Sequence, residues 1–143
     1  KTVGLYGTSE IPNYTMLPEH SRWFVKYFSN KGDVVCDSFF GRGTNLIASA
    51  YEGRKIIGWD LSKANLEAVK KTCIEYTSIN PQDVQLHHSC GVEMAEYRES
   101  ENIVDLALTD IPYFQAEIYN PDDSRDLGNI KKIDEFLKKV NKV

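Results

Sequence analysis

Two parts of the chain combine glycine and carboxylate residues in a way that could bind a nucleoside. Residues 37–44, with the sequence DSFFGRGT, follow an apolar run that predicts a strand, and Gly41 and Gly43 would let the backbone approach a ligand closely where the strand turns into a helix. About twenty residues later Asp60 ends a second apolar run. A carboxylate at that position can accept hydrogen bonds from ribose hydroxyls.

A third polar group follows another apolar run, in residues 104–114 with the sequence VDLALTDIPYF. Pro112 lacks a backbone donor and stops the strand, so Asp110 lies in the loop that follows it. In an open parallel sheet, ligands bind at the edge formed by the carboxyl ends of the strands. The three groups are therefore expected at the same edge.

Strands and helices must alternate to place these residues. The pattern predicts strands over residues 33–37, 55–59, 84–88 and 104–109, and helices from Pro18 to before residues 30–32, then over residues 43–52, 62–77 and 130–140. Such alternation implies right-handed crossovers and a parallel sheet, hence an α/β fold. We expect residues 1–143 to form a single domain, with residues 1–17 as a loop that wraps onto it.

Two groups of apolar residues are expected inside the fold. The first helix has an aromatic stripe at helical spacing that is interpreted as core, formed by Trp23, Phe24, Tyr27 and Phe28. The three cysteines, Cys36, Cys73 and Cys90, have no paired spacing, which suits reduced thiols, and they are also interpreted as core.

The chain resembles a family of DNA enzymes over about residues 15–114. DSFFGRGT resembles the Asp-Pro-Phe-x-Gly-x-Gly-Thr signature, and the DIPY of residues 110–113 resembles the Asp-Pro-Pro-Tyr signature, of the S-adenosylmethionine-dependent amino-methyltransferases that modify adenine N6 or cytosine N4 in DNA. Ser38 and Ile111 depart from the two prolines of these signatures, and neither change removes a group that the chemistry needs.

The resemblance implies a Rossmann-like methyltransferase fold, with a mostly parallel sheet, helices on both faces, and the strand order third, second, first, fourth. Sheets of that family usually have seven strands, so the carboxyl-terminal strands are expected to be missing from a partial domain. The fourth strand would then be an apolar edge. We expect a missing segment or a second chain to cover it.

The resemblance also implies a cofactor site for S-adenosylmethionine. It places Asp37, Phe39, Gly41 and Gly43 around the methionine portion, where Thr44 either bonds or caps the helix, with Thr15 and Met16 at the same end. Asp60 would bind the ribose, with Trp59 or Leu61 beside the adenine. An Asp that commonly follows the third strand of the family is replaced here, so Ser89 or a backbone group is expected to take its place.

For catalysis, the resemblance implies that the Asp110 carboxylate and the Ile111 carbonyl hold the target amine. Acceptors around the amine orient its lone pair and offset the positive charge that develops on attack. The base must leave the duplex stack, and Tyr113, which follows Pro112, is the expected platform for it, with Phe114 as a second surface. The adjacent His87 and His88 would point to opposite faces of a strand, so no metal site is predicted.

The charge of the chain limits its expected contacts with DNA. A net charge of −4 and a sequence pI near 5.4 argue against a large phosphate-binding surface. Local basic residues would then serve instead, drawn from Arg22, Lys26, Lys31, Arg42 and Arg54. No membrane span or signal peptide is recognised in the sequence, and a soluble cytoplasmic protein is expected.

Three functions remain open at this point. The leading one is a DNA methyltransferase, with adenine N6 favoured over cytosine N4 because the second signature begins with Asp where the cytosine enzymes tend to carry Ser. An RNA base amino-methyltransferase has similar signatures. A catalytically inactive, methyltransferase-like binding subunit would explain the acidic charge and the Asp that is absent near Ser89.

Overall fold

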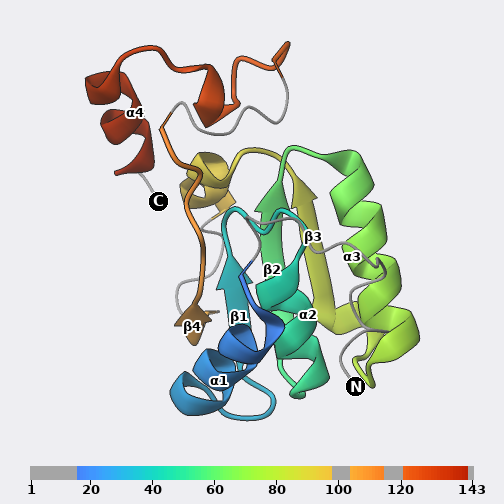
Figure 1. The fold of residues 1–143 in the computed structure, drawn as a ribbon. Coiled ribbons are helices and arrows are strands. Elements are labelled where there is room, and N and C mark those ends of the chain that lie inside the picture. The colour runs from blue at the N-terminus through green and yellow to red at the C-terminus, as the bar shows by residue number, and fades with distance from the viewer. Residues whose placement is uncertain (1–15, 98–103, 115–120, 142–143) are drawn as a thin grey trace.

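A four-stranded parallel sheet forms the centre of the molecule (Figure 1). The structure is a computed structural model, and it describes residues 16–97, 104–114 and 121–141. The strand order is β3-β2-β1-β4, which confirms the order expected from the resemblance. The expected α/β architecture with a parallel sheet is likewise confirmed, and it is consistent with a Rossmann-like fold.

The observed elements follow the predicted alternation closely. The helices are α1 (Pro18–Phe28), α2 (Thr44–Tyr51), α3 (Lys63–Tyr76) and α4 (Ile133–Val140), the strands are β1 (Val34–Asp37), β2 (Lys55–Asp60), β3 (Val84–His88) and β4 (Leu106–Ala107), and the short 3-10 helices are η1 (Pro81–Asp83), η2 (Gly91–Tyr97) and η3 (Leu127–Asn129). The cap of α3 is the predicted one, because the Ser62 hydroxyl accepts a hydrogen bond from the Asn65 amide at 3.3 Å.

The main core lies between the sheet and the helices α2 and α3. Every residue of α2 from Thr44 to Ala50 is buried, and Leu46, Ile56 and Val69 join one hydrophobic cluster there. The opposite face of the sheet is covered by a smaller cluster that includes Met94 of η2. All three cysteines are buried and free, as expected. No helix in the described part of the chain is long and apolar enough to cross a membrane.

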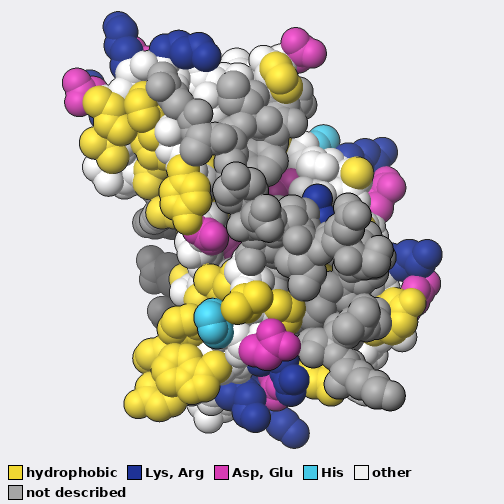
Figure 2. Space-filling model, viewed as in Figure 1, with side chains coloured by type: hydrophobic (Ala, Val, Ile, Leu, Met, Phe, Trp, Pro, Cys, Tyr) yellow, Lys and Arg dark blue, Asp and Glu magenta, His cyan; other side chains and the backbone are white. Residues whose placement is uncertain are grey.

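The prediction that the aromatic stripe of α1 is core is wrong. Trp23, Tyr27 and Phe28 are 57%, 70% and 54% exposed, and apolar side chains gather at the surface near α1 (Figure 2). The helix instead buries the face that carries Ser21 and Val25, which packs on α2. The aromatic rings contact one another, with Trp23 stacked on Tyr27 at 5.2 Å between centroids.

The expectation that Arg54 is a basic residue of the surface is also wrong, because its side chain is only 5% exposed. Its guanidinium donates to the Glu52 carbonyl at 2.6 Å and to the Ser29 hydroxyl at 2.9 Å. It also donates to the Val25 and Ser29 carbonyls. Arg54 therefore satisfies the carboxyl-terminal carbonyls of α1 and holds this helix beside α2.

Two elements are shorter than predicted. β4 has two residues rather than six, because the Asp105 carboxylate takes the Val34 amide that a longer ladder would use, at 2.8 Å. α4 begins at Ile133 rather than near residue 130, because Asp126 caps η3 and the chain leaves η3 in an extended conformation at Ile130. The segment from Pro121 to α4 lies beyond the carboxyl ends of the strands (Figure 1).

Candidate functional site

A pocket of about 70 Å³ opens at the carboxyl edge of the sheet. Its walls come from the loop after β1, the end of β2, the loop after β3, the loop after β4, and the segment that enters η3. The residues that line it are Phe39, Gly41, Asp60, Leu61, Ser89, Cys90, Gly91, Asp110, Pro112, Asp126 and Leu127. The three polar groups singled out in the sequence therefore share one pocket.

Asp60 joins the glycine turn to the start of α3. One carboxylate oxygen accepts the Gly41 amide at 2.9 Å, and the other accepts the Ser62 amide at 2.7 Å and the Asn65 side-chain amide at 3.2 Å. Burial raises the pKa of Asp60, and these hydrogen bonds to the carboxylate oppose that rise. Asp60 is thus a preorganised acceptor on the pocket wall.

Ser89 presents an unsatisfied hydroxyl to the same pocket. Its side chain is 5% exposed, and among the described residues its Oγ has no hydrogen-bond partner. A buried hydroxyl without a partner is costly in a folded protein, and a bound polar ligand is one way to satisfy it. The residues present therefore fit a ligand that combines apolar surface with hydrogen-bonding groups.

The loop that carries Ser89 lies against the loop after β1. A Cβ atom added to Gly91 would collide with the Ser38 carbonyl oxygen and would lie 2.9 Å from the ring of Phe39. Only glycine lets the two loops approach this closely. This contact fixes the distance between two walls of the pocket.

Asp37 lies beneath the pocket rather than on its wall. The carboxylate is 2% exposed and accepts hydrogen bonds from the Thr109 hydroxyl at 2.8 Å, the Asn45 side-chain amide at 3.0 Å and the Phe39 amide at 3.1 Å. Burial raises its pKa to about 6, although the three hydrogen bonds act in the opposite direction. Asp37 ties the end of β1 to α2 and to the residue before Asp110.

The loop after β4 contributes two of its four signature residues to the pocket. Asp110 and Pro112 line it, whereas Ile111 and Tyr113 do not and are 38% and 59% exposed. An exposed tyrosine ring beside the pocket is available to a planar group from outside. Phe114 turns inward instead and contacts Phe136 of α4, with 5.4 Å between ring centroids.

The pocket brings together seven of the predicted site residues, namely Phe39, Gly41, Asp60, Leu61, Ser89, Asp110 and Pro112. Six others do not line it: Met16, Asp37, Gly43, Thr44, Ile111 and Tyr113. Thr15 lies outside the described residues. Gly43 has a structural task, since its φ of 77° is left-handed and a Cβ there would collide with Val69 of α3.

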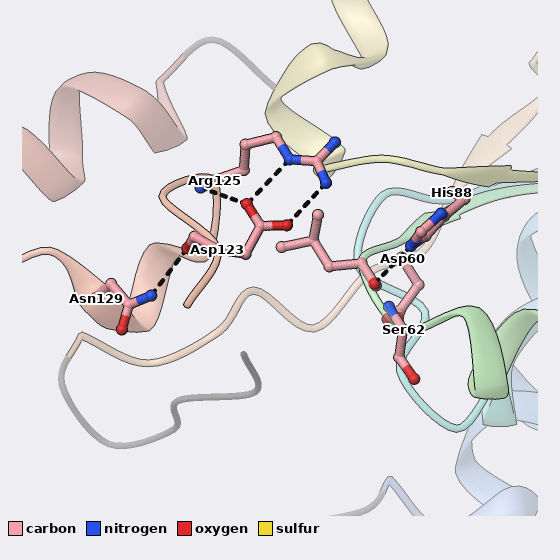
Figure 3. Close-up of polar contacts among 7 residues, drawn as sticks. Asp60, Ser62, His88, Asp123, Arg125 and Asn129 are labelled. Atoms are coloured by element: carbon pink, nitrogen blue, oxygen red, sulfur yellow. Dashed lines mark hydrogen bonds and ion pairs between the residues drawn. The ribbon is translucent and has the colours of Figure 1, made fainter. Parts of the chain in front are cut away.

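Sequence reasoning missed the roof of the pocket, which Asp126 and Leu127 form. Both are 2% exposed, and Asp126 accepts the Gly128 amide at 2.8 Å as the cap of η3. The neighbouring Asp123 pairs with Arg125 and its carbonyl accepts from Asn129 (Figure 3). The Asp and Asn residues of this segment favour turns with an ordered backbone, but nothing in the sequence indicates that the segment lines the pocket.

The two histidines of β3 have separate contacts. His87 stacks on Trp59 with 4.9 Å between ring centroids, and His88 donates from Nε2 to the Leu61 carbonyl at 2.8 Å (Figure 3). Among the described residues there is no group of three or more metal-binding side chains. The site is built from carboxylates, a hydroxyl, glycines and apolar walls.

Comparison with known protein families gives a match for part of the chain. Residues 18–71 match a family model described as DNA methylase. The matched segment runs from the start of α1 into α3 and includes the glycine turn and Asp60, while Ser89 and Asp110 lie outside it. A search of curated proteins found no match to the chain.

Proposed function

We propose that this chain, whose residues 18–71 match a DNA methylase family model, is a DNA methylase of the N6-adenine or N4-cytosine type, and that it transfers a methyl group from S-adenosylmethionine to adenine N6. One observation carries the proposal. The glycine turn and Asp60 of the matched segment share a pocket with Asp110, which lies some 50 residues further along the chain. A donor and an amine acceptor could meet only where these two groups adjoin.

The pocket residues suit S-adenosylmethionine, which when bound supplies an electrophilic methyl group on a sulfonium. Asp60 would accept the ribose hydroxyls, and Leu61 and Phe39 would provide apolar contacts for the adenine. The unsatisfied Ser89 hydroxyl would bond the polar edge of that ring. Gly41 keeps the wall free of a side chain.

The residues after β4 would hold the target amine. The Asp110 carboxylate and the Ile111 carbonyl are acceptors that orient the two N–H bonds of an exocyclic amine, so that its lone pair points toward the donor. Pro112 brings no amide donor to compete for these acceptors. The exposed ring of Tyr113 would stack on a base swung out of the duplex.

The choice of adenine N6 over cytosine N4 depends on Asp110. A carboxylate accepts a hydrogen bond from the amine more strongly than a serine hydroxyl, the residue that tends to stand there in the cytosine enzymes. DNA rather than RNA as the substrate is supported by the match to the DNA methylase family.

The proposal is tested by methyl transfer with an Asp110→Asn variant. With labelled S-adenosylmethionine and duplex DNA, the wild-type chain should label N6-methyladenine, and Asp110→Asn should reduce the rate by about 100-fold or more while donor affinity stays within about twofold. Asp134→Asn on the exposed surface of α4 is the matched control. Undiminished transfer by Asp110→Asn, label found only on cytosine, or label transferred to an RNA substrate but not to the duplex DNA, would contradict the assignment.

The small pocket volume supports a second candidate, the non-catalytic binding subunit. About 70 Å³ is far below the roughly 300–1,000 Å³ of typical ligand sites, so a nucleoside needs the roof to move. Calorimetry with S-adenosylmethionine distinguishes the two candidates. A well-folded sample that binds no donor would favour the subunit.

A further inference from the structure

The loop that carries Asp110 leaves the sheet from a short strand. β4 has two residues, which pair with Val35 and Cys36 of β1, and the Leu108 amide adds one bond to the Cys36 carbonyl at 2.9 Å. The Asp110 side chain is exposed, so burial does not hold it in place. Its position relative to the rest of the pocket must therefore be set by the backbone immediately before it.

A buried amide from α2 reaches that backbone. The Asn45 side chain accepts a hydrogen bond from the Ser21 hydroxyl of α1 at 2.7 Å, and it donates to the Asp37 carboxylate at 3.0 Å and to the Leu108 carbonyl at 3.3 Å. Ser21, Asp37 and Asn45 are 0%, 2% and 4% exposed. A buried polar network whose members are all bonded favours a single geometry. Asn45 therefore fixes the end of β4 against β1 and α2.

Thr109 makes a second connection, one residue further along the chain. Its hydroxyl donates to the Asp37 carboxylate at 2.8 Å and accepts from the Ser38 hydroxyl at 3.3 Å. Asp37 and Ser38 begin the turn after β1 that contains the two glycines. Because consecutive Cα atoms are only about 3.8 Å apart, Asp110 has little freedom relative to this turn.

We propose that Thr109 and Asn45, acting through Asp37, are positioning residues that set Asp110 against the glycine turn. This inference rests on the proposed function, in which the donor binds beside the turn and Asp110 holds the target amine. Neither Thr109 nor Asn45 lines the pocket. Since a displacement of about 1 Å in an active site can reduce the rate by about 100-fold, the network controls the rate of transfer rather than the affinity for the donor.

Thr109 is the best residue for testing this role, because it is partly buried and its hydroxyl can be removed without changing the shape of the side chain. Thr109→Val removes the hydroxyl, whereas Thr109→Ser keeps it. Thr109→Ala removes it without added bulk and replaces Thr109→Val if that variant does not fold. Thr72→Val is the matched control, since Thr72 is also partly buried, belongs to α3 and does not line the pocket.

The first experiment compares kcat for methyl transfer to duplex DNA with donor affinity measured by calorimetry. Burial raises the pKa of Asp37 to about 6, so assays at about pH 8 keep this carboxylate charged and able to accept both hydrogen bonds. Thr109→Val should lower kcat by about tenfold or more and leave donor affinity within about twofold of the wild type. Thr109→Ser and Thr72→Val should keep kcat within about threefold of the wild type, because both preserve the network.

A second experiment needs neither donor nor DNA. The Leu108 amide bonds to Cys36 at the point where the network meets the backbone. In a hydrogen-exchange measurement, this amide should exchange about tenfold faster in Thr109→Val than in Thr109→Ser, while the amides of β2 exchange equally in both. Faster exchange throughout the sheet would instead show a general loss of stability and would overturn the inference.

The outcomes separate the inference from the proposed function. Equal kcat values for Thr109→Val and Thr109→Ser in a chain whose wild type transfers methyl groups would overturn the inference and leave the proposed function intact. A loss of donor affinity as large as the loss of kcat, or unchanged exchange at Leu108, would do the same. Absence of transfer by the wild type would overturn the proposed function, and the inference with it.

Discussion

Asp37 contributes to stability in a direction opposite to that of most aspartates. Because burial raises its pKa from 3.8 to about 6, the folded chain binds a proton at Asp37 more tightly than the unfolded chain does. The contribution is therefore largest below about pH 4 and is lost as the pH rises through about 6. At about 1.4 kcal/mol per pH unit, the change amounts to about 3 kcal/mol.

Comparison with Asp37→Asn isolates this contribution, since the amide does not titrate while all other groups do so in both proteins. The variant loses the acceptor that receives the Asn45 amide, which lowers its stability by a constant amount. The advantage of the wild type over Asp37→Asn should fall by about 3 kcal/mol between about pH 4 and about pH 8, as measured by denaturant unfolding. Parallel stability profiles would show that Asp37 titrates normally in the folded chain.

At the same scale, the sequence predicted most of the pocket residues that follow strand ends, although it missed Cys90 and Gly91 after β3, and it missed the roof residues entirely. Asp60 and Asp110 could be predicted because the carboxyl edge of a parallel sheet gathers such residues. Asp126 follows no strand, and its place in the pocket depends on how residues 121–130 fold back over the sheet. The buried Asp37 carboxylate is also bonded by Thr109, which is distant in sequence, as well as by the nearby Asn45.

Gly91 governs the contact between two elements, the start of η2 and the turn after β1. Gly91→Ala should destabilise the fold by about 2–4 kcal/mol, because the new Cβ meets the backbone of Ser38, which cannot relax without moving the wall of the pocket. Thermal unfolding would measure the loss, and donor affinity should fall with it.

Gly32→Ala provides the control for that substitution. Gly32 has a φ of 89° and nothing within 4 Å of an added Cβ, so its replacement costs only the left-handed strain, about 1 kcal/mol. Equal losses for the two variants would show that the loops at Gly91 separate easily.

Helices and strands were predicted best where the residues that start or cap a helix and the pattern of buried apolar residues gave the same bounds. Pro18, the Ser62 cap and the apolar face of α2 placed three helices within one or two residues of their observed bounds. The periodicity of α1 was recognised, yet its buried side was assigned wrongly, because aromatic residues dominate the pattern while Ser21 and Val25 make the contact with α2. The Ser21 hydroxyl donates to Asn45 at 2.7 Å, a polar contact that an apolar pattern cannot reveal.

For the whole molecule, charge sets the expected strength of DNA binding. Of the five basic residues proposed for phosphate contacts, Arg54 is buried and Arg22 pairs with Glu52 at 2.6 Å, which leaves Lys26, Lys31 and Arg42 exposed. With about three phosphate contacts, log affinity should fall with log salt at a slope of about −3. Fluorescence anisotropy with a labelled duplex measures this slope, and a value steeper than about −6 would reveal a larger basic surface.

The described part of the molecule contains three apolar clusters, and one of them belongs to the carboxyl-terminal segment. Leu127, Ile130 and Phe136 pack with Cys90 in a cluster of their own, apart from the one that holds α2 and α3 on the sheet. Regions with separate apolar clusters can unfold separately. In a hydrogen-exchange experiment, the backbone amides of η3 should therefore exchange through a local unfolding that leaves the amides of the sheet protected. The sheet then forms a fixed wall of the pocket, and the carboxyl-terminal segment forms a wall that can open while the sheet stays folded.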